Sequence, residues 1–95
     1  MVSFTVRMEI PESERETAKE YLRKLAAESR KEPGCVTYIP HLVEEGPATV
    51  LIYEQYVDEA ALEHHRSTPH FQEYAANGLY KLITSRSLER LHALA

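Results

Sequence analysis

The sequence lacks most of the residues from which the familiar cofactor and disulfide motifs are built. Its 95 residues include one cysteine, no tryptophan and only three glycines. A single cysteine forms no disulfide within the chain and excludes zinc sites built on several cysteines. Three scattered glycines form neither a GxGxxG turn nor a phosphate-binding loop. The nucleotide-binding classes that depend on such loops are therefore excluded.

Clusters of positive charge and long apolar segments are also missing. The chain has 11 Lys+Arg against 15 Asp+Glu, a net charge of −4, and no basic run. Nucleic acids and anionic membrane surfaces attract concentrated positive charge, so neither is expected as a partner. No segment approaches the ~20 apolar residues of a membrane span, and Arg7 and Glu9 interrupt the first apolar stretch, unlike a signal peptide. We expect a cytoplasmic protein with a single domain, residues 1–95.

What the chain does have is a clear series of strand and helix signals. The alternation of apolar and polar residues over 2–10 has the period of a strand. Apolar residues at helical spacing predict a helix over about residues 14–31, and Ser13 with Glu16 forms a capping-box pattern before it. Five further elements are predicted: strands 35–43 and 48–57, two short helices that begin after the caps Asp58 and Thr68, and a last element within 84–95.

The order of these elements predicts the fold. Spacing of Leu88, Leu91 and Leu94 would also fit a helix at the end of the chain, but the preceding β-α-β-β-α order favours a strand. The result is the ferredoxin-like β-α-β-β-α-β plan, an α+β fold with an antiparallel sheet. Its strand order, 4-1-3-2, places the second strand at an edge, where Pro40 is tolerated. One sheet face would stay uncovered with apolar side chains on it, so we expect a homodimer packed sheet on sheet.

Two segments carry a family resemblance: EPGCVTYIP at 32–40 and IYEQYVDEAALEHHRSTPHFQEY at 52–74. They resemble the antibiotic biosynthesis monooxygenase (ABM) family, near its quinol monooxygenase-like proteins and an autoinducer-processing isomerase. The resemblance implies a dimeric α+β barrel with a pocket between each sheet and its helices. Members of this family include oxygenases that use neither metal nor flavin. Another branch degrades haem and relies on Asn, Trp and His. The chain has no tryptophan, and Ala75-Ala76-Asn77 where the haem ligand would lie, so no cofactor is expected.

Three histidines, His64, His65 and His70, lie within seven positions. Adjacent side chains on a helix project about 100° apart, so His65, on the face of Leu62, points to the sheet and His64 toward solvent. His65 and His70 are five apart across a helix break, unlike the i, i+4 pairs of zinc helices, so no metal site is expected. We predict that His65 is a catalytic base and that Glu54 fixes its tautomer and raises its pKa. A buried histidine with a purely structural role is the alternative that the sequence leaves open.

Three functions are compatible with these residues. The first is a cofactor-independent monooxygenase of a small aromatic or quinol-like substrate, which ionises the substrate and lets it react with O2 directly. The second is an isomerase of a small phosphorylated ketone, which requires Arg7, Arg66 or Arg86 in the pocket. The third is a non-catalytic ligand-binding dimer, in which His65 and Glu54 are buried with no open cavity beside them. The expected substrate contacts are Tyr56, His70, Arg7 and Arg86, although surface ion pairs are the commoner role of such arginines.

Overall fold

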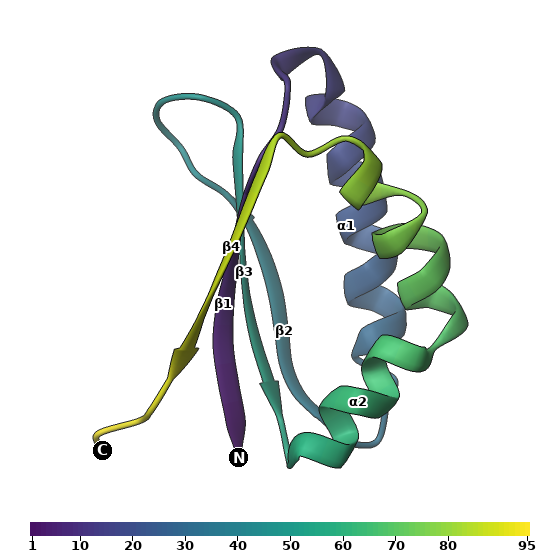
Figure 1. The fold of residues 1–95 in the computed structure, drawn as a ribbon, viewed down its shortest axis with the longest axis vertical. Helices are drawn as coiled ribbons and strands as arrows, with labels where there is room; N and C mark the ends of the chain where they lie inside the picture. Colours follow the sequence, from purple (N-terminus) through teal and green to yellow (C-terminus); the bar gives the residue numbers. More distant parts are fainter.

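Four antiparallel strands form one sheet, and the helices all lie against the same face of it (Figure 1). The computed structural model describes residues 1–95. The strands are β1 (Val2–Glu9), β2 (Cys35–Leu42), β3 (Thr49–Tyr56) and β4 (Ser85–Leu91), arranged in the order β2-β3-β1-β4. The predicted ferredoxin-like α+β fold, its strand order and the final strand are therefore confirmed.

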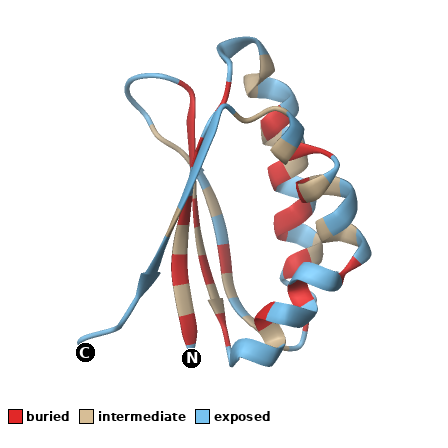
Figure 2. Ribbon diagram, in the orientation of Figure 1, coloured by how far each residue is buried: buried red, intermediate tan, exposed pale blue.

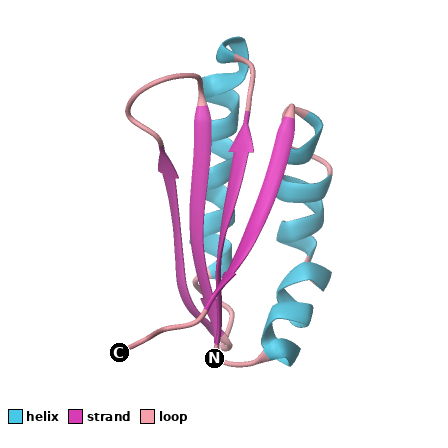
Figure 3. Cartoon of the chain, turned by 60° about the vertical axis from the view of Figure 1, so that its left-hand side comes forward, coloured by secondary structure: helices cyan, strands magenta, loops and turns pink.

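The helical layer consists of two α-helices and three shorter pieces (Figure 3). Helix α1 (Arg15–Ser29) follows the 3₁₀ turn η1 (Glu12–Glu14), and α2 (Glu59–Ser67) follows β3. The chain then forms a π-helix, η2 (Phe71–Ala76), and a 3₁₀ turn, η3 (Leu79–Lys81), before β4. No helix is both long enough and apolar enough to cross a membrane.

The predicted caps of the later helices are present, but the first is not. The Asp58 carboxylate accepts a hydrogen bond from the Ala61 amide at 2.8 Å, and the Thr68 hydroxyl accepts one from the Phe71 amide at 3.2 Å. The capping box at Ser13 is wrong, because α1 begins without a side-chain cap. Ser13 lies inside the η1 turn, which forms directly after Pro11. A residue already within a turn lacks the extended backbone that an N-cap requires.

The core fills the space between the sheet and the helices, as the red segments in Figure 2 show. Every second residue of β1 and β3 points into it, which is the period expected of strands with one buried face. Each fully buried side chain of this kind contributes about 1.5–3 kcal/mol of hydrophobic stabilisation. The main contributors from β1, β3 and α1 are Phe4, Val6, Met8, Val50, Ile52, Leu22 and Leu25.

The edge position of β2 explains its proline. Pro40 pairs with Ile52 only on the side of β3, and the outer side of β2 has no neighbouring strand. The register of β2 also shifts between Cys35 and Thr37. Both features are tolerated at the edge of a sheet, where a missing N–H and a bulge cost few ladder hydrogen bonds.

The other face of the sheet is not covered by any helix of this chain (Figure 1). The pairing register places Arg7 opposite Leu51 and Ser87 on this face. It also carries apolar side chains: Ile39 and Leu91 are 43% and 45% exposed. The face is thus partly apolar and open in the single chain.

Candidate functional site

His65 lies at the centre of a buried polar cluster between α2 and the sheet. The residue is 2% exposed, and Leu62, one turn earlier on α2, is 1% exposed. His64, about 100° further around the same helix, is exposed. The helical geometry thus places His65 inward and His64 outward, as predicted from their adjacency.

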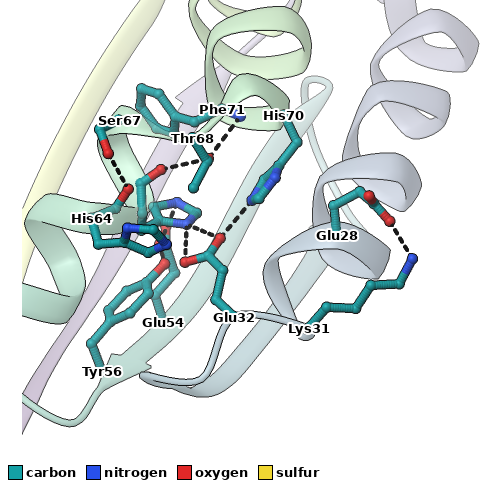
Figure 4. A network of polar contacts seen from close by, with 11 residues as sticks. Glu28, Lys31, Glu32, Glu54, Tyr56, His64, Ser67, Thr68, His70 and Phe71 are labelled. Atoms are coloured by element: carbon teal, nitrogen blue, oxygen red, sulfur yellow. Dashed lines mark hydrogen bonds and ion pairs between the residues drawn. The ribbon is translucent and has the colours of Figure 1, made fainter.

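The carboxylate that holds His65 comes from Glu32, in the turn between α1 and β2. Glu32, labelled in Figure 4, is 8% exposed. Its Oε2 accepts a hydrogen bond from His65 Nδ1 at 2.9 Å. A carboxylate accepts only, so the proton of a neutral His65 lies on Nδ1. The other ring nitrogen, Nε2, then has a free lone pair.

His70 reaches the same carboxylate from the other side. Its Nε2 lies 2.5 Å from Glu32 Oε2, and its ring centroid is 6.2 Å from that of His65. The break between α2 and η2 redirects the chain, so two histidines five positions apart converge on one carboxylate. One ligand-capable atom from each of Glu32, His65 and His70 falls within 4.8 Å of the others. His70, expected as a substrate contact, is thus engaged with Glu32.

Glu54 lies on the opposite side of the His65 ring. It is 6% exposed, and its Oε1 accepts a hydrogen bond from the Tyr56 hydroxyl at 2.7 Å. Its distance to His65 Nε2 is 3.8 Å, which is too long for a hydrogen bond. Glu54 therefore does not set the tautomer of His65, contrary to prediction; Glu32 does.

Burial shifts the ionisation of both groups. Desolvation raises the pKa of Glu54 to about 7, although the hydrogen bond from Tyr56 acts in the opposite direction. Desolvation also lowers the pKa of His65 below its usual 6.5 and outweighs the hydrogen bond from Glu32. The predicted rise in the pKa of His65 is therefore wrong. Burial disfavours the protonated imidazole more than the hydrogen bond to Glu32 favours it. A neutral imidazole at pH 7 is nevertheless the form that accepts a proton.

Two small cavities adjoin Glu54 and His65. Both are bordered by Glu54, His65, Phe71 and Tyr80, and each has a volume of about 20 Å³. A cavity of this size holds about one water molecule. An aromatic ligand therefore does not fit unless side chains that line these cavities move aside. The absence of a larger cavity beside His65 and Glu54 is what the third function, a non-catalytic ligand-binding dimer, predicts.

A larger cavity, of about 180 Å³, lies away from these residues, between α1 and β2. Its only fully buried lining residue is Leu22, and its polar lining groups are at least partly exposed. It contains no buried polar group of the kind that orients a reacting ligand. The small cavities at Glu54 and His65 are chemically the more significant.

Comparison with known proteins places the chain in a family. Residues 1–77 match the family model described as antibiotic biosynthesis monooxygenase, ABM. The chain belongs to the ABM family. The matched segment contains Glu32, Glu54, His65 and His70, whereas Arg86 lies beyond it.

Several solved structures share the whole fold. PA3566 from Pseudomonas aeruginosa is 30% identical, with a TM-score of 0.90 over 99% of this chain and 94% of that one. Rv0793 from Mycobacterium tuberculosis is 25% identical, with a TM-score of 0.87 over 99% and 95%. An uncharacterised protein from Synechocystis, sll1783, is 39% identical over 46 residues, which span 48% of this chain and 31% of that protein. The match thus covers less than a third of the cyanobacterial protein.

Of the four substrate contacts expected in this ABM protein, the structure places only Arg86 at a cavity. Tyr56 is fully buried and donates its hydroxyl proton to Glu54, and His70 is bound to Glu32. Arg7 lies on the other face of the sheet, opposite Leu51, and is separated from the cavities by the sheet itself. Strand alternation explains this placement, since Arg7 follows the inward-facing Val6.

Glu32 is the functional candidate that the sequence analysis missed. It lies within the EPGCVTYIP segment of the ABM resemblance, but that resemblance assigns no role to Glu32. The run of charged residues before it is solvent-exposed, which made another exposed glutamate the natural expectation. The position directly before Pro33-Gly34 was the one signal that set Glu32 apart.

Proposed function

We propose that this ABM protein is a cofactor-independent monooxygenase of a small aromatic, quinol-like substrate, with His65 as its base. The observation that carries the proposal is the position of the imidazole. Its Nδ1 is held by Glu32 at 2.9 Å, and the ring borders both cavities together with Glu54. A carboxylate on one nitrogen and an accessible lone pair on the other is the arrangement of a general base.

The reaction begins with proton transfer. His65 Nε2 takes a proton from an activated C–H or O–H group, and the bonding electrons stay on the substrate as a delocalised anion. The anion reduces O2 by electron transfer and forms a C–O bond, giving a peroxide anion that recovers the proton from the imidazolium. Loss of water then leaves one oxygen atom in the product and releases the other. The substrate supplies all the electrons, so no external reductant takes part.

Glu54 stabilises the anion in this scheme. Its pKa of about 7 leaves a substantial neutral fraction at neutral pH, and a neutral carboxyl group donates a hydrogen bond. The Tyr56 hydroxyl holds one carboxyl oxygen, so the other is available to face the substrate oxygen. A hydrogen bond that strengthens as charge develops contributes directly to the rate.

The substrate enters when the small cavities open. Phe71 is the first residue of the π-helix η2, and its ring packs edge-on to that of Tyr80, with centroids 6.0 Å apart. π-Helical turns are frequent at functional sites, because their irregular hydrogen bonding allows local adjustment. Displacement of these two rings would merge the cavities beside His65 and Glu54.

The test is oxygen consumption by chelator-treated protein with hydroquinones, naphthoquinols and anthrone-type substrates, after subtraction of autoxidation in buffer. His65→Gln removes the base, and His64→Gln is the matched control on the exposed face of the same helix. We expect uptake in the wild type and in His64→Gln, and a loss of at least ~10-fold in His65→Gln. Uptake no faster than autoxidation, or equal rates in His65→Gln, would contradict the proposal.

An isomerase of a small phosphorylated ketone is the second candidate, and one observation favours it. Arg66 and Arg86 both border the cavity that contains Glu54 and His65, where a phosphate would need positive charge. Arg7 is not available for this role. The same base would move a proton between two carbons, without O2. Exchange of a substrate C–H for deuterium in D2O, followed by NMR with no oxygen consumed, would distinguish the isomerase from the oxygenase.

We also propose that the chain forms a homodimer through the open face of the sheet. That face carries Ile39, Leu51, Tyr53 and Leu91, and apolar sheet faces are seldom left in water. Light scattering should give twice the mass of the chain, and Tyr53→Glu should reduce it to one chain. A wild type that is monomeric at micromolar concentration would refute this arrangement.

A further inference from the structure

Glu32 is a buried carboxylate without a cationic side chain to neutralise it. Its side chain is 5% exposed, and its hydrogen-bond partners are the two imidazoles of His65 and His70. The nearby cations are engaged elsewhere: Lys31 pairs with Glu28, and Arg30 donates to the Tyr38 carbonyl (Figure 4 shows the Lys31–Glu28 pair). Buried charges in proteins are normally paired with an opposite charge or coordinate a metal.

The three side chains form a recognisable ligand set. Two imidazole nitrogens and one carboxylate oxygen are the donors that Zn²⁺ and related divalent ions prefer. The donors converge from three places in the chain: the turn after α1, the inner face of α2 and the residue before η2. His65 Nδ1 and His70 Nε2 lie 2.9 and 2.5 Å from the same oxygen, Glu32 Oε2.

The spacing of these atoms suits coordination after a small adjustment. Metal–ligand bonds of about 2.1 Å in a tetrahedral site separate neighbouring ligand atoms by about 3.4 Å. Glu32 Oε2 would therefore need to withdraw from the two nitrogens by less than about 1 Å. A rotation of the Glu32 side chain would provide this adjustment.

We propose that Glu32, His65 and His70 form a binding site for a divalent transition metal such as Zn²⁺. Solvent supplies the remaining ligand through the side of His70, whose side chain is 16% exposed, compared with 3% for His65. The site goes beyond the proposed oxygenase, and its existence does not depend on that activity.

The metal site and the proposed base use the same imidazole in opposite ways. A metal on His65 Nδ1 takes the lone pair there, so the proton of the neutral ring moves to Nε2. Nε2 then faces Glu54 as a donor and no longer accepts a proton from a substrate. Metal-loaded protein is therefore inactive as an oxygenase, and a chelator restores its activity.

Metal binding is measured on the chelator-treated full chain by calorimetric titration with Zn²⁺ and by the visible absorption of bound Co²⁺. Wild type and His64→Gln should bind one ion per chain. His70→Gln and Glu32→Gln should each weaken Zn²⁺ binding by at least ~10-fold. Losing a residue that only orients a metal ligand already lowers metal affinity by about that factor, and losing the ligand itself should lower it at least as much. His70→Gln is the decisive variant. His70 is the least buried of the three ligands, so this change is the least expected to prevent folding, and circular dichroism checks that the variant is folded.

NMR of the histidine side chains provides the second readout. Zn²⁺ should shift the Nδ1 resonance of His65 and the Nε2 resonance of His70, and the pattern should be absent in His70→Gln. Failure to bind Zn²⁺, or equal affinity in wild type, Glu32→Gln and His70→Gln, would overturn the site. Neither readout needs a substrate, so a protein that binds metal but consumes no oxygen retains the site and loses only the proposed oxygenase.

Discussion

Replacing Glu54 with glutamine should remove a pH-dependent loss of stability. The folded protein raises the pKa of Glu54 from its ordinary 4.5 to about 7, chiefly through burial. A carboxyl group with a raised pKa binds its proton more tightly in the folded state than in the unfolded one. Its contribution to stability is therefore fully present below pH 4.5 and declines as the pH rises through 7.

The size of this effect follows from the pKa difference. Each tenfold change in proton affinity corresponds to about 1.4 kcal/mol, so a rise from 4.5 to about 7 corresponds to about 3 kcal/mol. Glutamine stays neutral at every pH, and its amide oxygen still accepts the Tyr56 hydroxyl. The difference in unfolding free energy, Glu54→Gln minus wild type, should therefore grow by about 3 kcal/mol between acid and mildly alkaline pH.

Urea denaturation of both proteins at several pH values, with a chelator present, measures this difference. Subtracting the unfolding free energy of the wild type from that of Glu54→Gln at each pH removes the contribution of the other titrating groups. Glu59→Gln is the control, because Arg90 lowers the pKa of the exposed Glu59 carboxylate by hydrogen bonding. Its difference from wild type should have the opposite sign, becoming less favourable as the pH rises. A Glu54→Gln difference that is flat or falls with pH would refute the account of Glu54 as a destabilised carboxylate.

Three further predictions concern the base and its support. The value of kcat/KM should decrease at pH values below 6.5, the ordinary histidine pKa, because His65 becomes protonated there. It should also decrease above pH 7, because Glu54 ionises. Glu54→Gln should abolish only the decrease at alkaline pH. An activity that instead rises through pH 7 would identify Glu54 as the base. Glu32→Gln should lower kcat/KM by about 10–100-fold in chelated protein, because a charge-assisted hydrogen bond of about 1.5–3 kcal/mol no longer holds the ring; an unchanged rate would separate Glu32 from the base. Gly34→Ala should destabilise the fold by about 1–3 kcal/mol in urea denaturation, since its new methyl group would meet the Ala61 Cβ of α2, and wild-type stability would show that α2 yields freely.

The sequence predicts the elements that depend on local pattern. Strand alternation over residues 2–10 assigned the inward face of β1, and the caps at Asp58 and Thr68 located the later helices. The inward direction of His65 followed from its place one turn after Leu62. Each of these inferences uses a period or a cap that is written in neighbouring residues.

The contacts within the site depend on distant residues and were less accessible. Glu32 and His65 are 33 positions apart, and no local pattern distinguishes a buried glutamate from the exposed ones before it. The sequence paired His65 with Glu54, which is indeed adjacent, but the ring orientation is decided by Glu32. Whether desolvation or hydrogen bonding has the larger effect on a pKa depends on the three-dimensional surroundings of the group. The direction of the pKa shift of His65 was therefore predicted wrongly.

The most direct test of the account is the tautomer of His65. A two-dimensional ¹H–¹⁵N NMR experiment on the chelator-treated protein near pH 7 reports the protonation of each ring nitrogen, and His65→Gln assigns the signals. We predict a neutral ring with its proton on Nδ1, facing Glu32, and an unprotonated Nε2 facing the cavities. A proton on Nε2, or a fully protonated ring, would show that Glu32 does not hold His65 in the form that accepts a proton from a substrate.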